Sequence, residues 1–189
     1  MENPRLFHFS EDPNIELFEP RPVRVASVRA PGLEWLNGPL VWAIEAATQG
    51  LYLFPRECPR IVLWRTPETT AEDLDRWWGA RDCRMIAHIE WRWFERLRTA
   101  TIHRYEFATE GFEDLNDYGA WVSRSAQRPI AIEALTDLPA AMAAEGVELR
   151  IMPNLTPLRD VWSTSLHASG VRLRNATGWE GPTPALVTP

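Results

Sequence analysis

The 189-residue sequence contains no lysine, so arginine supplies all 20 of its basic side chains. Two explanations remain open: a GC-rich genome that favours arginine codons, or selection for the forked, anion-binding guanidinium group. The formal net charge is −6. An acidic chain does not have the basic surface typical of proteins that bind double-stranded nucleic acid, so we do not expect that class of partner.

Cysteine is also scarce, with only Cys58 and Cys83 in the chain. Two cysteines are too few for a disulfide framework or a metal cluster. We therefore expect two reduced thiols and a cytoplasmic protein. No apolar run approaches the length of a membrane span, and the first residues lack the pattern of a signal peptide, so we expect no membrane partner.

The glycine-rich loops that usually hold phosphate groups are missing. The sequence has neither the G-x-G-x-x-G pattern nor the G-x-x-x-x-G-K-[ST] pattern. It also lacks G-x-S-x-G, the turn that carries the nucleophile of many hydrolases. These absences exclude the best-known sequence signatures of nucleotide binding and of serine hydrolases, but they leave other nucleotide sites open.

Apolar residues make up 45% of the chain, which is ordinary for a globular protein. We predict a single α+β domain over residues 1–178 and a proline-rich tail over residues 179–189. Strands and short helices are mixed without strict alternation, which favours a mostly antiparallel, split sheet around a cleft with short flanking helices. The predicted strands cover residues 5–10, 40–45, 60–66, 84–90, 101–107, 120–125 and 129–135.

Helical spacing and capping residues predict the remaining elements. Thr69 or Thr70 can cap a helix that Gly79 ends. The other predicted helical segments are a turn over residues 13–17 and helices over residues 46–54, 91–100, from about 138, and 157–170. The helix from about 138 either continues past Gly146 or is broken there, and the last helix would place His167 at the surface or at the helix end.

A histidine lies in the first predicted strand, in the segment Phe7-His8-Phe9-Ser10. Because side chains alternate along a strand, His8 and Ser10 share one face. His8 is either a satisfied core residue or part of a ligand site, where an imidazole presents a hydrogen-bond donor or acceptor at a fixed position.

The segments "HFS" and "VWAIEAATQGLY" together resemble the ADP-ribosyltransferase fold. In that superfamily an early strand carries a histidine with Ser or Thr two residues later, and a later strand leads into a helix that bears a tyrosine. The resemblance implies that His8 and Ser10 bind a ribose hydroxyl, that Tyr52 stacks on nicotinamide, and that NAD is the cofactor.

The superfamily also has a glutamate at the start of a later strand. The corresponding segment "GAWVSRS" contains Trp121 and no acid. Glu106, Glu133 and Glu148 are the strand-like acids elsewhere, and Glu133 in "IAIE" is the best candidate for a catalytic acid. Over nearly its full length the chain resembles a family of uncharacterised bacterial proteins with segments such as "LFHFSEDPNIELFEPRP" and "VELRIMPNLTPL". That resemblance implies no particular activity.

Two further sets of residues can be read in two ways. Arg56 and Arg60 flank the turn "FPRECPR", where they are either solvated charges on a stiff loop or a clamp for the phosphates of a dinucleotide. His88 and His103 could pair across neighbouring strands, with Glu90 nearby, but no metal-ligand spacing supports a metal site and we expect none.

Two classes of function therefore remain. The first is an enzyme that handles a nucleotide, with His8, Ser10, Tyr52 and Arg56 around NAD, ADP-ribose or a phosphorylated RNA end. The second is a non-catalytic module that binds a ligand or another protein. The missing glutamate favours the second, whereas the polar His8 and Ser10 between phenylalanines favour the first. The sequence does not indicate an oligomeric state.

Overall fold

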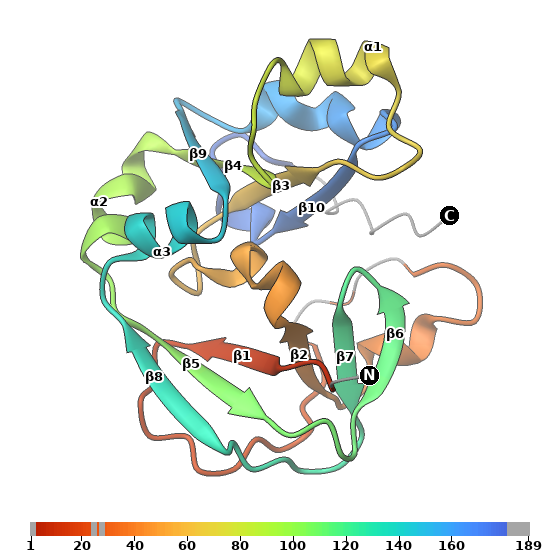
Figure 1. Cartoon of the computed structure of the whole chain (residues 1–189), viewed down its shortest axis with the longest axis vertical. Coiled ribbons are helices and arrows are strands. Elements are labelled where there is room, and N and C mark those ends of the chain that lie inside the picture. The colour runs from red at the N-terminus through yellow and green to blue at the C-terminus, as the bar shows by residue number, and fades with distance from the viewer. Residues whose placement is uncertain (1–2, 24–25, 27–28, 181–189) are drawn as a thin grey trace.

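Two β-sheets pack against each other through a shared core (Figure 1). The structure is a computed structural model that describes residues 3–23, 26 and 29–180. One sheet has six antiparallel strands in the order β6-β7-β2-β1-β5-β8, and the other has four strands in the order β10-β3-β4-β9. This confirms the predicted α+β class and the mostly antiparallel, divided sheet.

The six-stranded sheet contains the first strand of the chain. Its members are β1 (Leu6–Ser10), β2 (Val41–Glu45), β5 (Ile102–Phe107), β6 (Glu113–Asp117), β7 (Ala120–Ser123) and β8 (Ala131–Leu135). The strands of the four-stranded sheet are β3 (Arg60–Trp64), β4 (Met85–Glu90), β9 (Val147–Met152) and β10 (His167–Val171). Within that sheet β4 and β9 run parallel, while β3 runs antiparallel to both of its neighbours.

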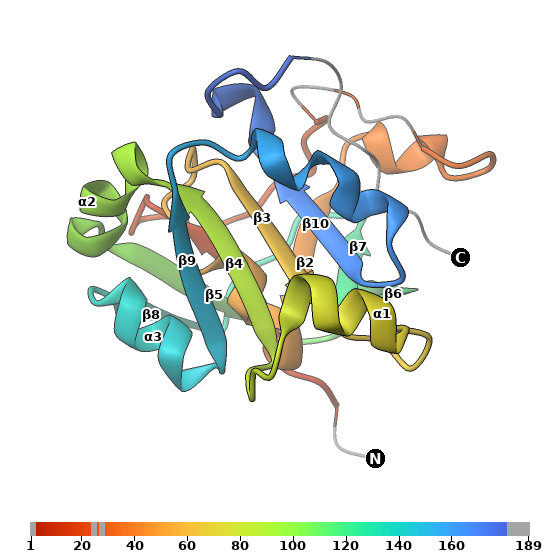
Figure 2. The same cartoon turned by 90° about the horizontal axis from the view of Figure 1, so that it is seen from above.

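Short helices cover the four-stranded sheet. The α-helices are α1 (Ala71–Asp73), α2 (Trp91–Thr99) and α3 (Leu138–Ala144), and the tighter or wider helical turns are η1 (Glu34–Asn37), η2 (Ala46–Tyr52), η3 (Leu74–Trp78), η4 (Thr156–Ser163) and η5 (Leu173–Asn175). Seen from above, α1 and the helical segment that follows β9 lie over the outer face of this sheet, and α2 and α3 lie beside β9 (Figure 2).

The capping predicted for the clearest helix is confirmed. The Thr70 side chain accepts a hydrogen bond from the backbone N–H of Asp73, and Gly79 ends the element with φ of 70°. A glycine suits that position because a positive φ is costly for residues with a Cβ atom. The helix that Thr70 caps begins as the α-helical turn α1 and continues as the wider, π-helical η3. The sequence predicted where this helix begins and ends, but not the π-helical part.

Several predicted elements are wrong. Residues 13–17 form no helix, because Asp12 instead bonds the backbone N–H of Asn14 in a local turn. The helix from 138 does break near Gly146, as the sequence allowed, but the segment after the break forms β9. The predicted last helix is η4 followed by β10, so His167 is a buried strand residue and not a surface helix residue. Strand β6 was not predicted at all.

The proposed pairing of two histidines is also wrong. His88 lies on β4 in the four-stranded sheet, and His103 lies on β5 in the six-stranded sheet. In the part of the chain that the structure describes, no three His, Cys, Asp or Glu side chains are placed to hold a metal ion.

The core has a layer between the sheets, a second layer on the outer face of the four-stranded sheet, and two smaller clusters that include residues of the six-stranded sheet. The inner layer joins Phe7 and Ile44 of one sheet to Val62 and Ala87 of the other. The outer layer packs Ile61, Leu63 and Ile86 under η3 and η4. Trp179 belongs to this outer layer, whereas residues 181–189 of the predicted tail lie outside the described residues, so the domain boundary at 178 remains a prediction.

Both cysteines are free, Cys58 buried and Cys83 partly exposed. Within the described ranges, no helix has the length and apolar character needed to cross a membrane.

Candidate functional site

A cavity of about 410 Å³ opens where β1 and β2 separate. Backbone pairing between these strands covers only Leu6 with Glu45 and Phe7 with Ile44, while β1 continues to pair with β5 as far as Ser10. The carboxyl-terminal half of β1 therefore has an edge free of β2, and residues from both faces of β1 line the gap. This split in the sheet creates the site.

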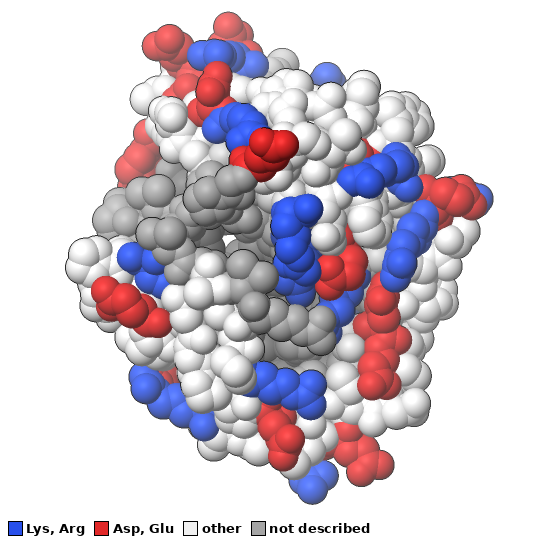
Figure 3. Space-filling view, turned by 180° about the vertical axis from the view of Figure 1, so that it is seen from behind, with Lys and Arg blue, Asp and Glu red and all other residues white. Residues whose placement is uncertain are grey.

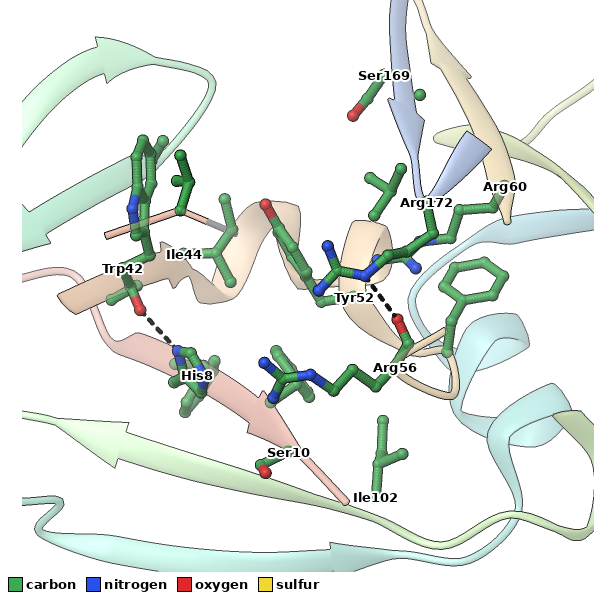
Figure 4. Close-up of a pocket in the computed structure, with 18 of the residues that line it drawn as sticks. His8, Ser10, Trp42, Ile44, Tyr52, Arg56, Arg60, Ile102, Ser169 and Arg172 are labelled. Atoms are coloured by element: carbon green, nitrogen blue, oxygen red, sulfur yellow. Dashed lines mark hydrogen bonds between the residues drawn. The ribbon is translucent and has the colours of Figure 1, made fainter. Parts of the chain in front are cut away.

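His8 lies on the cavity wall and links the two strands beyond the point where their backbones stop pairing. Its Nδ1 is 2.8 Å from the carbonyl oxygen of Trp42 (Figure 4). A carbonyl only accepts, so Nδ1 carries the proton and donates it, which leaves Nε2 as an acceptor in the neutral ring. Burial is the main cause that lowers the pKa of His8; the hydrogen bond to Trp42 opposes this fall, and the positive charge of Arg56 adds to it, so the neutral ring is favoured.

Ser10 is buried on the same strand and also lines the cavity. Its Oγ accepts a hydrogen bond from the backbone N–H of Asp12 at 3.1 Å. Because a hydroxyl can donate and accept at once, Ser10 keeps its proton available for a ligand.

Tyr52 approaches from the end of η2. Its ring is parallel to that of Phe9, with 6.4 Å between the ring centroids and 9° between their planes. The side chain retains 38% exposure, so part of the aromatic surface remains accessible. Burial raises the pKa of the Tyr52 phenol against the opposing charge of Arg60, which keeps the group neutral and able to donate a hydrogen bond.

Arginines supply most of the charge of the cavity. Those that line it are Arg29, Arg56, Arg60 and Arg172, whereas the acids that line it are Glu11 and Asp117. Glu11 is already paired with Arg96 at 3.0 Å, so its charge is offset. The resulting positive balance favours a ligand with negative charge. Basic side chains also lie beside the hollow at the centre of the face opposite that of Figure 1 (Figure 3).

The arginines differ in how firmly they are held. Arg60 is almost completely buried and donates to the carbonyl oxygens of Leu51 and Cys58 at 3.0 and 3.2 Å, so it acts as a fixed charge. Burial lowers the pKa of Arg60 to about 10, which still leaves it charged at neutral pH. Arg56 is exposed, and its guanidinium forms no hydrogen bond or ion pair with any residue in the described ranges.

The loops bring distant segments to this site. The Nε of Arg172 donates to the carbonyl oxygen of Arg56 at 3.2 Å, which joins the segment after β10 to the loop before β3. In Figure 4 both guanidinium groups point toward the space between His8 and Tyr52. A second cavity of about 630 Å³ shares His8, Arg56 and Arg172 with the first, so the arginines stand where the two cavities meet.

The structure therefore brings together four of the five residues singled out in the sequence. His8, Ser10, Tyr52 and Arg56 all line the same cavity. Glu133 is not among the lining residues; it lies on the edge strand β8, where it is paired with Arg104 at 2.5 Å. Its predicted catalytic role remains a prediction, and the structure gives it no place beside the other four.

Sequence reasoning missed Asp117, Arg29 and Arg172 as residues of the site. Asp117 had a signal, because the segment Asn116-Asp117-Tyr118-Gly119 is typical of a tight turn. Arg172 had no comparable signal. No spacing rule connects it to Arg56, which lies 116 residues earlier.

A family model described as a family of unknown function (DUF6886) matches residues 7–176. The chain belongs to DUF6886. No curated protein and no solved structure matches it. The comparisons thus place the chain in the uncharacterised family to which its sequence is similar, and they lend no support to the resemblance to ADP-ribosyltransferases.

The matched region of this DUF6886 protein runs from β1 to the residue after η5. All of the described residues that line the first cavity therefore lie within the family region.

Proposed function

We propose that this DUF6886 protein binds a phosphate-bearing nucleotide of the NAD or ADP-ribose class in the cavity beside β1. The observation that supports this most strongly is the convergence of an exposed arginine, a neutral histidine and a partly exposed tyrosine ring on one cavity. Each group meets a different part of such a ligand: phosphate, ribose hydroxyl and planar ring.

The size and walls of the cavity suit the proposal. Small-molecule sites commonly measure about 300–1,000 Å³ and combine aromatic walls with a few polar groups. The first cavity falls in this range at about 410 Å³, and the rings of Phe7, Phe9, Trp42 and Phe54 line it along with Tyr52. The adjoining second cavity provides room for the other half of a dinucleotide.

The phosphates would lie against Arg56 and Arg172, where the cavities meet. A guanidinium binds two phosphate oxygens at once. Arg56 forms no ion pair with a described residue that binding would have to break, whereas Arg172 is ion-paired with Glu57 at 3.5 Å. The fixed charge of Arg60 adds to the attraction without having to move.

Isothermal titration calorimetry with NAD and with ADP-ribose tests the proposal. We expect both to bind, and we expect Arg56→Ala to weaken binding at least about tenfold, because a charge-assisted hydrogen bond contributes about 1.5–3 kcal/mol. Arg98→Ala is the matched control, since Arg98 is exposed on α2 and paired with Glu95 outside the cavity.

If the wild-type protein binds neither compound, the proposal is wrong. Chromatography of the same samples for released nicotinamide distinguishes an enzyme that cleaves NAD from a module that only binds it.

A further inference from the structure

Asp117 is placed in the first cavity by an irregular hairpin. It ends β6, and the pairing of β6 with β7 changes register between Asp114 and Asp117. Asn116 and Tyr118, on either side of it, have φ of 51° and 46°, values that residues other than glycine seldom adopt. Bulges and strained backbone are frequent where a strand must redirect a side chain at a functional site.

Among the residues that the structure describes, none forms a hydrogen bond or ion pair with the carboxylate of Asp117. Its Oδ1 is buried and forms no hydrogen bond to any described residue, and the same holds for the buried Nε of Arg29. Both side chains line the first cavity, yet they do not form an ion pair with each other. Buried polar atoms are nearly always bonded, so two unpaired atoms of opposite character in one cavity require an explanation.

The two groups nevertheless act on each other electrostatically. Burial raises the pKa of the Asp117 carboxyl, and the charge of Arg29 opposes that rise. Burial lowers the pKa of Arg29, and Asp117 opposes that fall. Both charges also influence the pKa of the Tyr52 phenol, and all three side chains line the same cavity.

We propose that Asp117 and Arg29 together receive a ligand group that carries a hydrogen-bond donor beside an acceptor. A carboxylate only accepts and a guanidinium only donates, so one such group would satisfy both unpaired atoms. This inference rests on the proposed function and adds to it the recognition of a specific part of the ligand. In an NAD-type ligand the group is either the carboxamide of the ring or the hydroxyl pair of a ribose.

Calorimetric titration of Asp117→Ala and Arg29→Met with three probes tests the pairing. The probes are NAD, which has both groups, ADP-ribose, which has hydroxyl pairs but no carboxamide, and inorganic pyrophosphate, which has neither. We expect each substitution to weaken NAD binding about tenfold and to leave pyrophosphate binding unchanged. A loss for NAD alone identifies the carboxamide, and an equal loss for ADP-ribose identifies the hydroxyl pair.

Glu113→Ala is the matched control, because Glu113 is an exposed acid on the same strand and pairs with Arg124. If both cavity variants bind NAD as tightly as the control does, the inference is wrong and the proposed function stands. If the wild-type protein binds neither nucleotide, both are wrong.

The melting temperature of the free protein provides a second test that needs no ligand. If the Asp117 carboxylate forms no hydrogen bond or ion pair within the free protein, its replacement breaks no such contact. The melting temperature of the Asp117→Asn variant should therefore equal or exceed that of the wild-type protein. A lower melting temperature for Asp117→Asn would show that the carboxylate has a structural partner and would overturn the inference.

Discussion

Each sheet contains a histidine that bonds a backbone carbonyl oxygen, but only one of the two histidines borders a cavity. In each sheet a histidine Nδ1 meets a backbone carbonyl oxygen: His8 meets Trp42 at 2.8 Å, and His88 meets Ile61 at 3.3 Å. His88 is sealed in β4, a strand buried along its whole length, whereas His8 borders a cavity. The bond itself therefore does not mark function. The open edge of β1 beside the bond is the feature that distinguishes His8.

The two sheets as a whole also differ in how much of their surface is buried. Strands β3 and β4 are buried at every residue because helical segments and the other sheet cover their two faces. In the six-stranded sheet the edge strands β6 and β8 are largely exposed, and polar residues line the split between β1 and β2. We infer that the four-stranded sheet contributes mainly stability and the six-stranded sheet mainly the site.

The largest expected effect is on stability. Leu63 is completely buried in β3, on the face turned away from the cavity. We expect Leu63→Ala to lower the free energy of unfolding by about 4 kcal/mol, from lost burial and the void that remains. Urea denaturation measures the change, and Ile132→Ala on the exposed edge strand should cost less than about 0.5 kcal/mol. A loss of NAD affinity in folded Leu63→Ala would contradict the division between the sheets.

The second expected effect is a loss of stability as the pH falls. Burial lowers the pKa of His88 to about 4, with the charge of Arg150 adding to it, and burial lowers the pKa of His167 to about 4 as well. Unfolded histidines bind protons near pH 6.5, so the unfolded state gains protons first as the pH falls. Each histidine should therefore cost about 2 kcal/mol of stability between pH 7.5 and pH 5.

Urea denaturation at the two pH values measures this loss. The window lies above the usual range of carboxyl groups, so histidines dominate it. His88→Asn should reduce the pH dependence, whatever it does to stability at pH 7.5. An unchanged pH dependence in that variant would show that His88 is not a source of the effect.

A smaller effect concerns the ligand. His8→Asn keeps a donor near the position of Nδ1 and removes the acceptor Nε2, so it separates the bond to Trp42 from contact with a ligand. We expect His8→Asn, His8→Ala and Tyr52→Ala each to weaken NAD binding by about 1–3 kcal/mol. Calorimetry measures affinity, and circular dichroism confirms folding.

Trp91→Ala is the control for a lost aromatic ring, because Trp91 is 59% exposed on α2 and lies outside the cavity. If His8→Asn binds NAD normally while His8→Ala does not, His8 serves the strand connection alone.

The smallest expected effect is that of Glu133→Gln. Its ion pair with Arg104 is largely exposed on the Glu133 side, and such pairs contribute about 0–1 kcal/mol. We expect NAD affinity to be unchanged and stability to shift by less than about 1 kcal/mol. Loss of nicotinamide release in this variant, measured by chromatography, would instead support its predicted catalytic role.

Sequence patterns predicted the strands that are buried along their whole length. Residues 60–66 are an apolar run between Pro59 and Pro67, and residues 84–90 were predicted as a strand from alternation. They form β3 and β4 with shifts of one or two residues. Strands β9 and β10 were missed because the alanines before Gly146 and the spacing around Leu158 favour helices. The signal for β9 was Gly146, whose φ of 69° ends α3 and lets the chain extend.

Only the part of the site that is set by residues close together in the sequence could be predicted. Alternation along β1 places His8 and Ser10 together, and η2 carries Tyr52 to the same cavity. Arg172 and Asp117 reach it through the pairing of strands far apart in sequence, which depends on the whole fold. The polar strand β6 likewise forms only because it pairs with β7, so its composition could not indicate it.

The path of the chain between the sheets has a consequence for how the protein folds. After β2 the chain leaves the six-stranded sheet for β3 and β4, returns to it for β5 to β8, and leaves again for β9 and β10. Neither sheet is encoded by a continuous stretch, so neither can be completed during synthesis before most of the chain has emerged. Pairings between distant segments form slowly because closing long loops is costly in entropy. The cavity, which takes residues from β1 and from the end of β10, should therefore be among the last parts of the molecule to assemble.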